Sequence, residues 1–236
     1  MVFVVAEIGV NWDGDIKLAR EMIKNAKEAG FDAVKFQAFN KEIIKDHPEV
    51  NRLIKCAIST ENIDEINNIA KSVGIEWFCT PMYPEAVKLL EPYVKRYKVR
   101  VSDGRILLKN ESSELFDLIL ETKKDVIVSV EQNPSTSKYF NRSQIKWLYC
   151  VSKYPCDLND LDFSEINFFD GFSNHCPQII APLSAAILGT KIIEIHVTSD
   201  KSKKFVDNPV SFDYTDQKKL VKLIRDSEKI KRKQNP

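Results

Sequence analysis

Short apolar runs rich in β-branched residues alternate along the chain with longer segments whose apolar residues recur every three or four positions. The short runs predict strands, and the longer segments predict amphipathic helices. Eight strands are expected, at Phe3–Ile8, Ala33–Phe39, Ile75–Cys79, Tyr97–Val101, Val126–Val130, Trp147–Ser152, Gly171–Ser173 and Lys191–Val197. Because strands that alternate with helices pair in parallel, eight such units indicate an α/β fold, a single (β/α)8 TIM barrel spanning residues 1–236.

Capping residues mark several helix boundaries. Gly30 and Gly74 each follow a periodic segment, as glycine does where a helix ends in the left-handed conformation. Six helices are expected, at Asp15–Ala29, Thr60–Val73, Pro84–Tyr93, Ser112–Thr122, Pro177–Leu188 and Tyr214–Lys231. Residues 131–137 (EQNPSTS) instead have the composition of a loop, so we expect the helix after the fifth strand to be shortened or missing.

Composition narrows the classes of function. The 35 basic and 34 acidic residues leave a net charge of +1 and form no basic stripe of the kind that nucleic-acid binding needs. No apolar run approaches the ~20 residues of a membrane span, and the apolar start (MVFVVA) is too short for a signal peptide. The five cysteines contain no C-x-x-C pair, which favours a reduced, cytoplasmic protein. We interpret Cys79 and Cys150 as small core residues.

Polar residues at the carboxyl ends of the strands are the candidates for chemistry, because active sites of such barrels lie there. Side chains alternate along a strand, so Lys35 and Gln37 share the lumen face of the second strand. Glu194 and His196 share the lumen face of the eighth. A buried charge is costly unless it is paired, so charged residues at these positions indicate a functional site.

Two of the three histidines, His175 and His196, end the neighbouring seventh and eighth strands. Neighbouring strands lie ~4.8 Å apart, so the two imidazoles can share one metal ion and leave positions for water and substrate. Spacing alone leaves open the alternative that each is a hydrogen-bonded histidine of the barrel.

Eight short motifs, in order along the chain, resemble those of the sialic acid synthase family. They are residues 6–14 (AEIGVNWDG), 34–37 (VKFQ), 79–81 (CTP), 97–99 (YKV), 148–155 (LYCVSKYP), 171–175 (GFSNH), 194–200 (EIHVTSD) and 207–211 (DNPVS). Each match alone is weak, but together they extend over most of the chain and identify it as similar to the barrel domain of these enzymes.

The resemblance implies the family's reaction, in which phosphoenolpyruvate condenses with the open-chain aldehyde of an amino sugar such as N-acetylmannosamine. A divalent metal, manganese or alternatively magnesium, is expected on His175 and His196, where it polarises the aldehyde. Carbon 3 of phosphoenolpyruvate attacks the aldehyde, water adds at carbon 2, and phosphate leaves by C–O cleavage. The product is a sialic or other nonulosonic acid.

The resemblance also implies a role for each matching residue. The phosphoenolpyruvate site is expected to comprise Lys35, Gln37, Thr80, Lys98, Ser129, Ser152 and Ser173. Glu7, Lys35 and Glu194 are expected to take part in catalysis. Glu7 would orient the sugar or transfer a proton, and Glu194 would position a metal ligand or the sugar. Salt bridges to lysines are the alternative for both carboxylates, and Tyr154 is expected to line the sugar side.

Several positions depart from the family pattern. Trp12 and Asn208 each replace a histidine, and we expect the Trp12 indole to occupy space beside the sugar. Val101 replaces a serine, for which Ser102 is expected to substitute. Glu131 would repel phosphate unless an arginine balances it.

Two further departures concern Arg100 and the cover of the site. Arg100 is expected either to bind phosphate or to form an outward salt bridge. The loop after Phe39 is short, and the family's C-terminal antifreeze-like domain is not found in the sequence. We therefore expect an open mouth, completed in a homodimer or by a separate lid protein. We also expect poor use of N-acetylmannosamine, or a different acceptor.

Three functions remain open on the sequence. The first is a nonulosonic acid synthase that uses phosphoenolpyruvate and a sugar aldehyde. The second is a phosphoenolpyruvate-dependent or aldol-type enzyme with a different acceptor. The third is a degenerate, non-catalytic barrel, since fold alone does not determine function.

Overall fold

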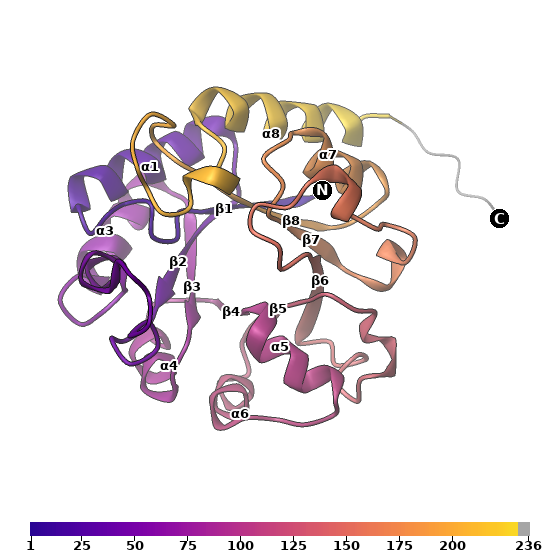
Figure 1. Cartoon of the computed structure of the whole chain (residues 1–236), viewed down its shortest axis with the longest axis horizontal. Helices are drawn as coiled ribbons and strands as arrows, with labels where there is room; N and C mark the ends of the chain where they lie inside the picture. The colour runs from indigo at the N-terminus through magenta and orange to yellow at the C-terminus, as the bar shows by residue number, and fades with distance from the viewer. Residues whose placement is uncertain (231–236) are drawn as a thin grey trace.

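The computed structural model describes residues 1–230, and in it eight parallel strands close into a barrel in the order β1 to β8 (Figure 1). The strands are β1 (Phe3–Glu7), β2 (Ala33–Ala38), β3 (Glu76–Pro81), β4 (Arg96–Val99), β5 (Asp125–Val130), β6 (Ile145–Cys150), β7 (Gly171–Asn174) and β8 (Ile192–His196). The predicted TIM barrel is therefore confirmed.

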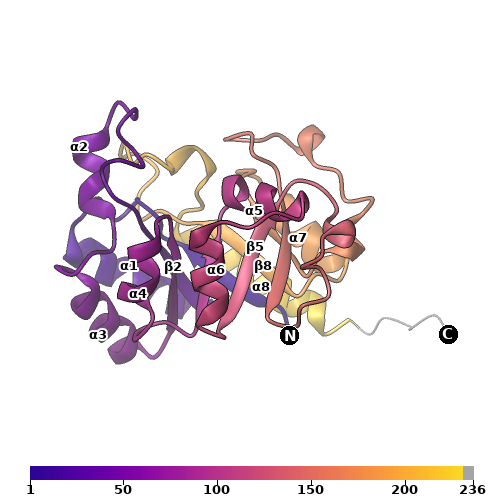
Figure 2. The same cartoon turned by 90° about the horizontal axis from the view of Figure 1, so that it is seen from below.

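Helices surround the strands on the outside of the barrel (Figures 1 and 2). The α-helices are α1 (Ile16–Ala29), α2 (Val50–Leu53), α3 (Ile63–Val73), α4 (Pro84–Leu90), α5 (Val101–Leu108), α6 (Glu114–Glu121), α7 (Ile180–Ile187) and α8 (Tyr214–Glu228). Short 3-10 turns are η1 (Ile54–Cys56), η2 (Pro134–Thr136), η3 (Leu158–Asp160), η4 (Ile166–Phe168) and η5 (Asn208–Val210). The predicted last residue of the final helix, Lys231, lies outside the described residues.

Closure of the barrel follows from the register of its first strand. Val5 lies opposite Ala33 of β2 on one side and opposite Glu194 of β8 on the other. Glu7 in turn lies opposite Lys35 and His196. The register thus places three of the predicted site residues side by side at the carboxyl ends of adjacent strands.

The segments that follow β5 and β6 differ from the repeating strand–helix pattern. Residues 131–144 contain only the turn η2, as predicted, and residues 151–170 contain only η3 and η4. Segment 131–144 is held against the barrel by Tyr139, on which Phe116 of α6 packs edge-to-face with ring centroids 5.3 Å apart. The second unit without an α-helix was not predicted.

An additional helix, α5, lies at the carboxyl end of β4. The predicted fourth strand was too long, because β4 ends at Val99 and α5 begins at Val101. Gly104 allows this helix to approach β5, since a Cβ atom there would lie 2.4 Å from the Ser129 carbonyl oxygen. Ser102 is consequently in the first turn of a helix and not at a strand end.

The first and last elements are joined at the amino-terminal end of the barrel. Arg225 of α8 contacts Asp32 at 2.7 Å and donates to the Val2 carbonyl oxygen at 2.5 Å. Glu228 accepts a hydrogen bond from the Val2 amide at 2.5 Å. No helix within residues 1–230 is long and apolar enough to cross a membrane.

Candidate active site at the carboxyl ends of the strands

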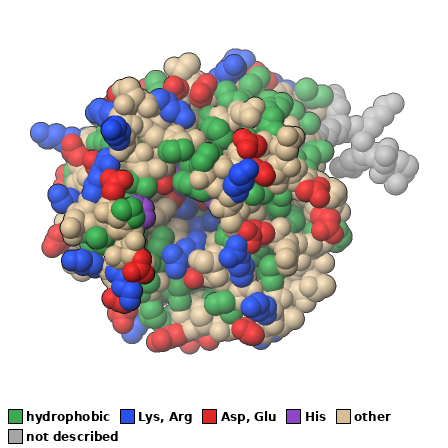
Figure 3. Space-filling model, viewed as in Figure 1, with side chains coloured by type: hydrophobic (Ala, Val, Ile, Leu, Met, Phe, Trp, Pro, Cys, Tyr) green, Lys and Arg blue, Asp and Glu red, His purple; other side chains and the backbone are tan. Residues whose placement is uncertain are grey.

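A cavity of about 430 Å³ opens at the carboxyl ends of the strands. Figure 3 shows this face, hollowed near its centre, with basic side chains in the hollow. All the predicted site residues line the cavity, namely Glu7, Lys35, Gln37, Thr80, Lys98, Ser102, Ser129, Ser152, Tyr154, Ser173, His175, Glu194 and His196. Its volume is within the range of small-molecule sites.

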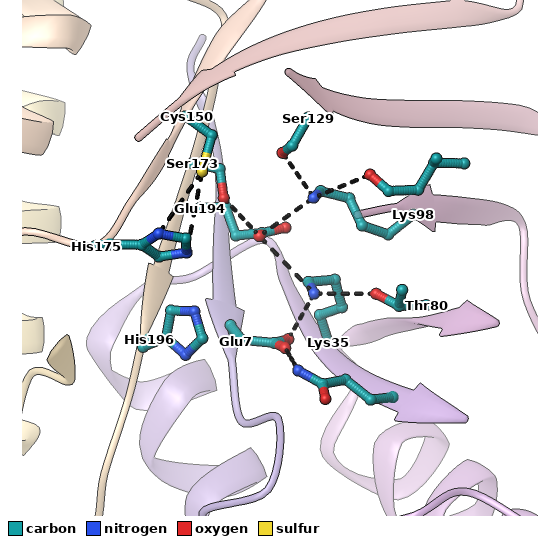
Figure 4. A network of polar contacts seen from close by, with 12 residues as sticks. Glu7, Lys35, Thr80, Lys98, Ser129, Cys150, Ser173, His175, Glu194 and His196 are labelled. Carbon is teal, nitrogen blue, oxygen red and sulfur yellow. Dashed lines mark hydrogen bonds and ion pairs between the residues drawn. The ribbon is translucent and has the colours of Figure 1, made fainter. Parts of the chain in front are cut away.

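Two buried lysines and two buried carboxylates occupy the floor of the cavity (Figure 4). Lys35 Nζ lies 2.9 Å from Glu7 Oε2 and 3.8 Å from Glu194 Oε1. Lys98 Nζ lies 3.6 Å from the same Glu194 oxygen. Each side chain is at most 5% exposed, so water does not solvate these charges. The opposite charges of the lysines and carboxylates therefore stabilise one another.

The two lysines differ electrostatically. Burial alone would lower the pKa of Lys35, but Glu194 and Glu7 outweigh it and raise that pKa. Lys98 has one close carboxylate, and burial lowers its pKa. For Glu194, burial is outweighed by Lys35 and Lys98, which lower its pKa to about 2. Burial raises the pKa of Glu7 despite Lys35. The carboxylate shared by both lysines is therefore Glu194.

Hydroxyl groups accompany these charges. Lys35 donates to Thr80 Oγ1 at 3.2 Å, and Lys98 donates to Ser129 Oγ at 2.7 Å. Ser173 Oγ donates to Glu194 Oε1 at 2.9 Å. Cations and hydroxyls that converge in this way form a site suited to a small anion with several oxygen atoms.

Gly9 provides the space between the floor and the rim on the β1 side. Its φ of +54° is in the left-handed region, and a Cβ atom there would lie 3.1 Å from both Glu7 Oε1 and Asp207 Oδ2. The Gln37 amide donates to Glu7 Oε1 at 2.6 Å and holds this carboxylate in the cavity. A side chain at position 9 would crowd both carboxylates.

The two histidine rings lie beside this floor, with centroids 5.5 Å apart and Tyr154 against both. His175 Nδ1 lies 2.7 Å from the Val151 carbonyl oxygen, so it carries the proton and leaves Nε2 as the ligand atom. His196 Nδ1 faces Asp207 Oδ2 and Tyr154 Oη, each at 3.3 Å. Burial lowers the pKa of His175 to about 4, which keeps the ring neutral.

A scan against models of protein families matches residues 22–235 to the NeuB family. The chain belongs to the NeuB family. It is 32% identical over 260 residues to N,N'-diacetyllegionaminic acid synthase of Legionella pneumophila, covering 97% of this chain and 72% of that protein. It is 27% identical over 262 residues to pseudaminic acid synthase of Campylobacter jejuni, covering 96% and 74%.

Solved structures agree with this assignment. A structure of N-acetylneuraminic acid synthetase from Leptospira borgpetersenii, in complex with citrate, superimposes with a TM-score of 0.85 at 26% identity. The match covers 97% of this chain and 84% of that one. The relatives of this NeuB-family chain are thus sialic, legionaminic and pseudaminic acid synthases, and the predicted resemblance to sialic acid synthases is confirmed.

Two of the residues that depart from the NeuB pattern, Trp12 and Asn208, do not line the cavity. The Trp12 indole is 1% exposed, packs edge-to-face on Phe36 and donates from Nε1 to the Cys56 carbonyl oxygen at 3.1 Å. It belongs to the core and does not line the cavity, so the prediction that it occupies space beside the sugar was wrong. Asn208 donates to the carbonyl oxygens of Asp200 and Lys203, and it too is absent from the cavity lining.

The region predicted to be the phosphate side contains two arginines. Arg100 lines the cavity and also pairs with Asp103 at 2.7 Å, so both predicted alternatives have a basis. Arg105 of α5 pairs with Glu131 at 2.6 Å and donates to Ser152 Oγ at 3.1 Å. The arginine that the sequence required beside Glu131 is therefore present.

Among the residues that sequence reasoning did not assign to this site, three contact predicted site residues: Asp207, Arg105 and Cys150. Asp207 lines the cavity and contacts His196, and its place in the DNPVS motif was the available signal. Nothing in the sequence indicated that Arg105 belongs to the site, because it contacts Ser152 from helix α5, which was not predicted. Cys150 is buried as predicted, but it also lines the cavity, with Sγ 3.7 Å from His175 Nδ1.

Proposed function

We propose that this protein condenses phosphoenolpyruvate with the aldehyde of an acetamido sugar to form a nonulosonic acid and release phosphate. Membership of the NeuB family supports condensation chemistry of this kind. The observation that carries the proposal is the pair of buried lysines, Lys35 and Lys98, held beside neutral hydroxyls under two histidines.

The lysine end of the cavity is assigned to phosphoenolpyruvate. A phosphate and a carboxylate need several charge-assisted hydrogen bonds, and Lys35, Lys98 and the hydroxyls of Thr80 and Ser129 can donate them. Ser173 lines the same end of the cavity and donates to Glu194. Lys98 is the better candidate for the main new ion pair, because its pKa is lowered in the free protein and an anion would favour its charged form.

His175 and His196 are assigned to one divalent ion, manganese or magnesium. Within residues 1–230, no three His, Cys, Asp or Glu side chains are grouped closely enough to hold a metal by themselves. The two rings nevertheless fit the task, because each has a partner at Nδ1, which orients it and leaves Nε2 for the metal. When bound, the ion would polarise the aldehyde oxygen, and substrate and water would complete its coordination.

The bonds of the proposed reaction balance without an external oxidant. Carbon 3 of phosphoenolpyruvate forms a bond to the aldehyde carbon as the C2–C3 double bond and the aldehyde C=O double bond are used up. Water adds at carbon 2, and the bond from carbon 2 to the phosphate oxygen breaks to leave a ketone there. One proton of the water goes to the former aldehyde oxygen, which becomes a hydroxyl, and the other leaves with phosphate. Glu7 is assigned to orient the acceptor or to exchange a proton during these steps, and Glu194 is assigned to keep both lysines in place. Tyr154 would line the acceptor side.

The test is release of phosphate from phosphoenolpyruvate by the purified chain with manganese, screened over a panel of aldoses, with mass spectrometry of the product. Phosphate release that requires both an aldose and the metal, together with a product three carbons longer than the acceptor, is the expected result. A matched control is Lys153→Met, which removes an exposed lysine, against Lys98→Met. Aldose-independent phosphate release, or no release with any aldose, would contradict the proposal.

A further inference from the structure

An ion pair lies at the rim of the cavity, above the end assigned to phosphoenolpyruvate. Glu131 comes directly after β5, two residues beyond Ser129, whose hydroxyl accepts a hydrogen bond from Lys98 in the floor. Two residues of strand rise about 7 Å, so Glu131 lies roughly that much nearer the mouth. Arg105 pairs with Glu131 at 2.6 Å, and the two side chains are 52% and 32% exposed. The pair is therefore in contact with solvent, unlike the lysines below it.

Ser152 connects this ion pair to the cavity. It lines the cavity, and its hydroxyl accepts a hydrogen bond from Arg105 Nη2 at 3.1 Å. Burial would raise the pKa of Glu131, but hydrogen bonds from Ser152 and Arg105 outweigh it and lower that pKa. The carboxylate is therefore charged at neutral pH. It holds the guanidinium behind Ser152, since Arg105 itself does not line the cavity.

Helix α5 fixes the backbone of Arg105 beside the rim. The preceding residue, Gly104, packs so closely on β5 that a Cβ atom there would lie 2.4 Å from the Ser129 carbonyl oxygen. Figure 1 shows α5 next to the end of β5. The other arginine of this region, Arg100, pairs with Asp103 of the same helix at 2.7 Å. Both arginines thus have a carboxylate partner, and removal of Glu131 would leave an unpaired guanidinium beside the cavity.

We infer that Glu131 promotes the release of inorganic phosphate, because its pairing with Arg105 prevents the guanidinium from binding the departing product. The inference rests on the proposed function, in which phosphate is formed beside Lys98 and Ser129. A phosphate that moves from Ser129 toward the mouth passes Ser152 and the ion pair. An unpaired guanidinium there would bind it through two parallel hydrogen bonds and retain it. The paired guanidinium has its donors engaged, and the rim carries no net charge at this point.

The test is calorimetric titration of the purified chain with inorganic phosphate and, separately, with phosphoenolpyruvate. Glu131→Gln should bind inorganic phosphate about 3–10-fold more tightly, which is the effect of one partly exposed charge-assisted contact. Phosphate should also become a correspondingly stronger product inhibitor. The affinity for phosphoenolpyruvate should change much less, because its phosphate group is held one strand step lower, at Ser129.

Three further variants show whether Arg105 is responsible. Glu131→Gln/Arg105→Met should return the phosphate affinity to that of the parent protein, because the freed guanidinium is gone. Glu131→Asp keeps the negative charge and should remain close to the parent protein. The matched control is Glu76→Gln, whose carboxylate pairs with Arg96 at 2.6 Å at the amino-terminal end of the barrel. It should leave both affinities unchanged.

The outcomes separate this inference from the proposed function. Unchanged phosphate affinity in Glu131→Gln overturns the inference and leaves the condensation intact. Equal tightening for phosphate and phosphoenolpyruvate indicates a general loss of negative charge and overturns capture by Arg105. Tighter phosphate binding that persists in the double variant overturns it as well. If the parent protein binds neither ligand, the proposed function fails, and the inference falls with it.

Discussion

Replacing Glu194 by glutamine removes the one carboxylate that both floor lysines share. Its Oε1 lies 3.8 Å from Lys35 Nζ and 3.6 Å from Lys98 Nζ. At an effective dielectric constant of ~20, each attraction is worth about 4 kcal/mol, and the desolvation of the carboxylate offsets several kcal/mol of the sum. We therefore expect Glu194→Gln to lower the free energy of unfolding by ~3–5 kcal/mol, because two buried cations lose a counter-charge.

Urea unfolding followed by circular dichroism measures this change. The matched control is Glu42→Gln, whose carboxylate pairs with Lys45 but is 75% exposed, so its loss should cost less than ~1 kcal/mol. Phosphoenolpyruvate should stabilise Glu194→Gln more than the parent protein, since its anionic groups can replace the missing charge. Equal unfolding free energies for Glu194→Gln and Glu42→Gln would refute the electrostatic account of the floor.

Three further changes test other parts of the structure. Lys98→Met should weaken phosphoenolpyruvate binding by ~1.5–3 kcal/mol in calorimetry, whereas unchanged affinity would remove Lys98 from the phosphate site. His196→Ala should lose bound manganese in elemental analysis after gel filtration, and full occupancy would disprove the assignment of this ring as a ligand. Gly104→Ala should lower the melting temperature by several degrees, because its Cβ would lie 2.4 Å from the Ser129 carbonyl oxygen. A melting temperature equal to that of the parent protein would show that α5 shifts without cost.

The strands and their lumen faces could be predicted because alternation is a local property of the sequence. The phase that places Lys35 and Gln37 together is fixed by the apolar residues between and beside them, and the same holds for Glu194 and His196. Once a closed parallel barrel is inferred, neighbouring strand ends must meet, which is why the floor of the site was largely anticipated.

Contacts between distant segments could not be predicted in this way. Trp12 occupies a motif position at which the family has a histidine. Its indole nevertheless donates a hydrogen bond to the carbonyl oxygen of Cys56, which is 44 residues away in the sequence. The start of α5 depends on how closely Gly104 packs against β5. The absence of an α-helix after β6 was not indicated by composition in the way that it was for residues 131–137. Residues 151–170 mix apolar and acidic residues and do not have the composition of a plain loop.

The junction between α8 and the start of β1 has a practical consequence for handling this protein. Val2 and Glu228 are in direct hydrogen-bond contact on the face opposite the cavity, so the described chain begins and nearly ends at one place. A short glycine–serine linker between these positions, with new ends opened at the exposed residues 141–143, should give a circular permutant with an intact mouth. Surface immobilisation through residue 1 of this chain should likewise leave the mouth facing the solution.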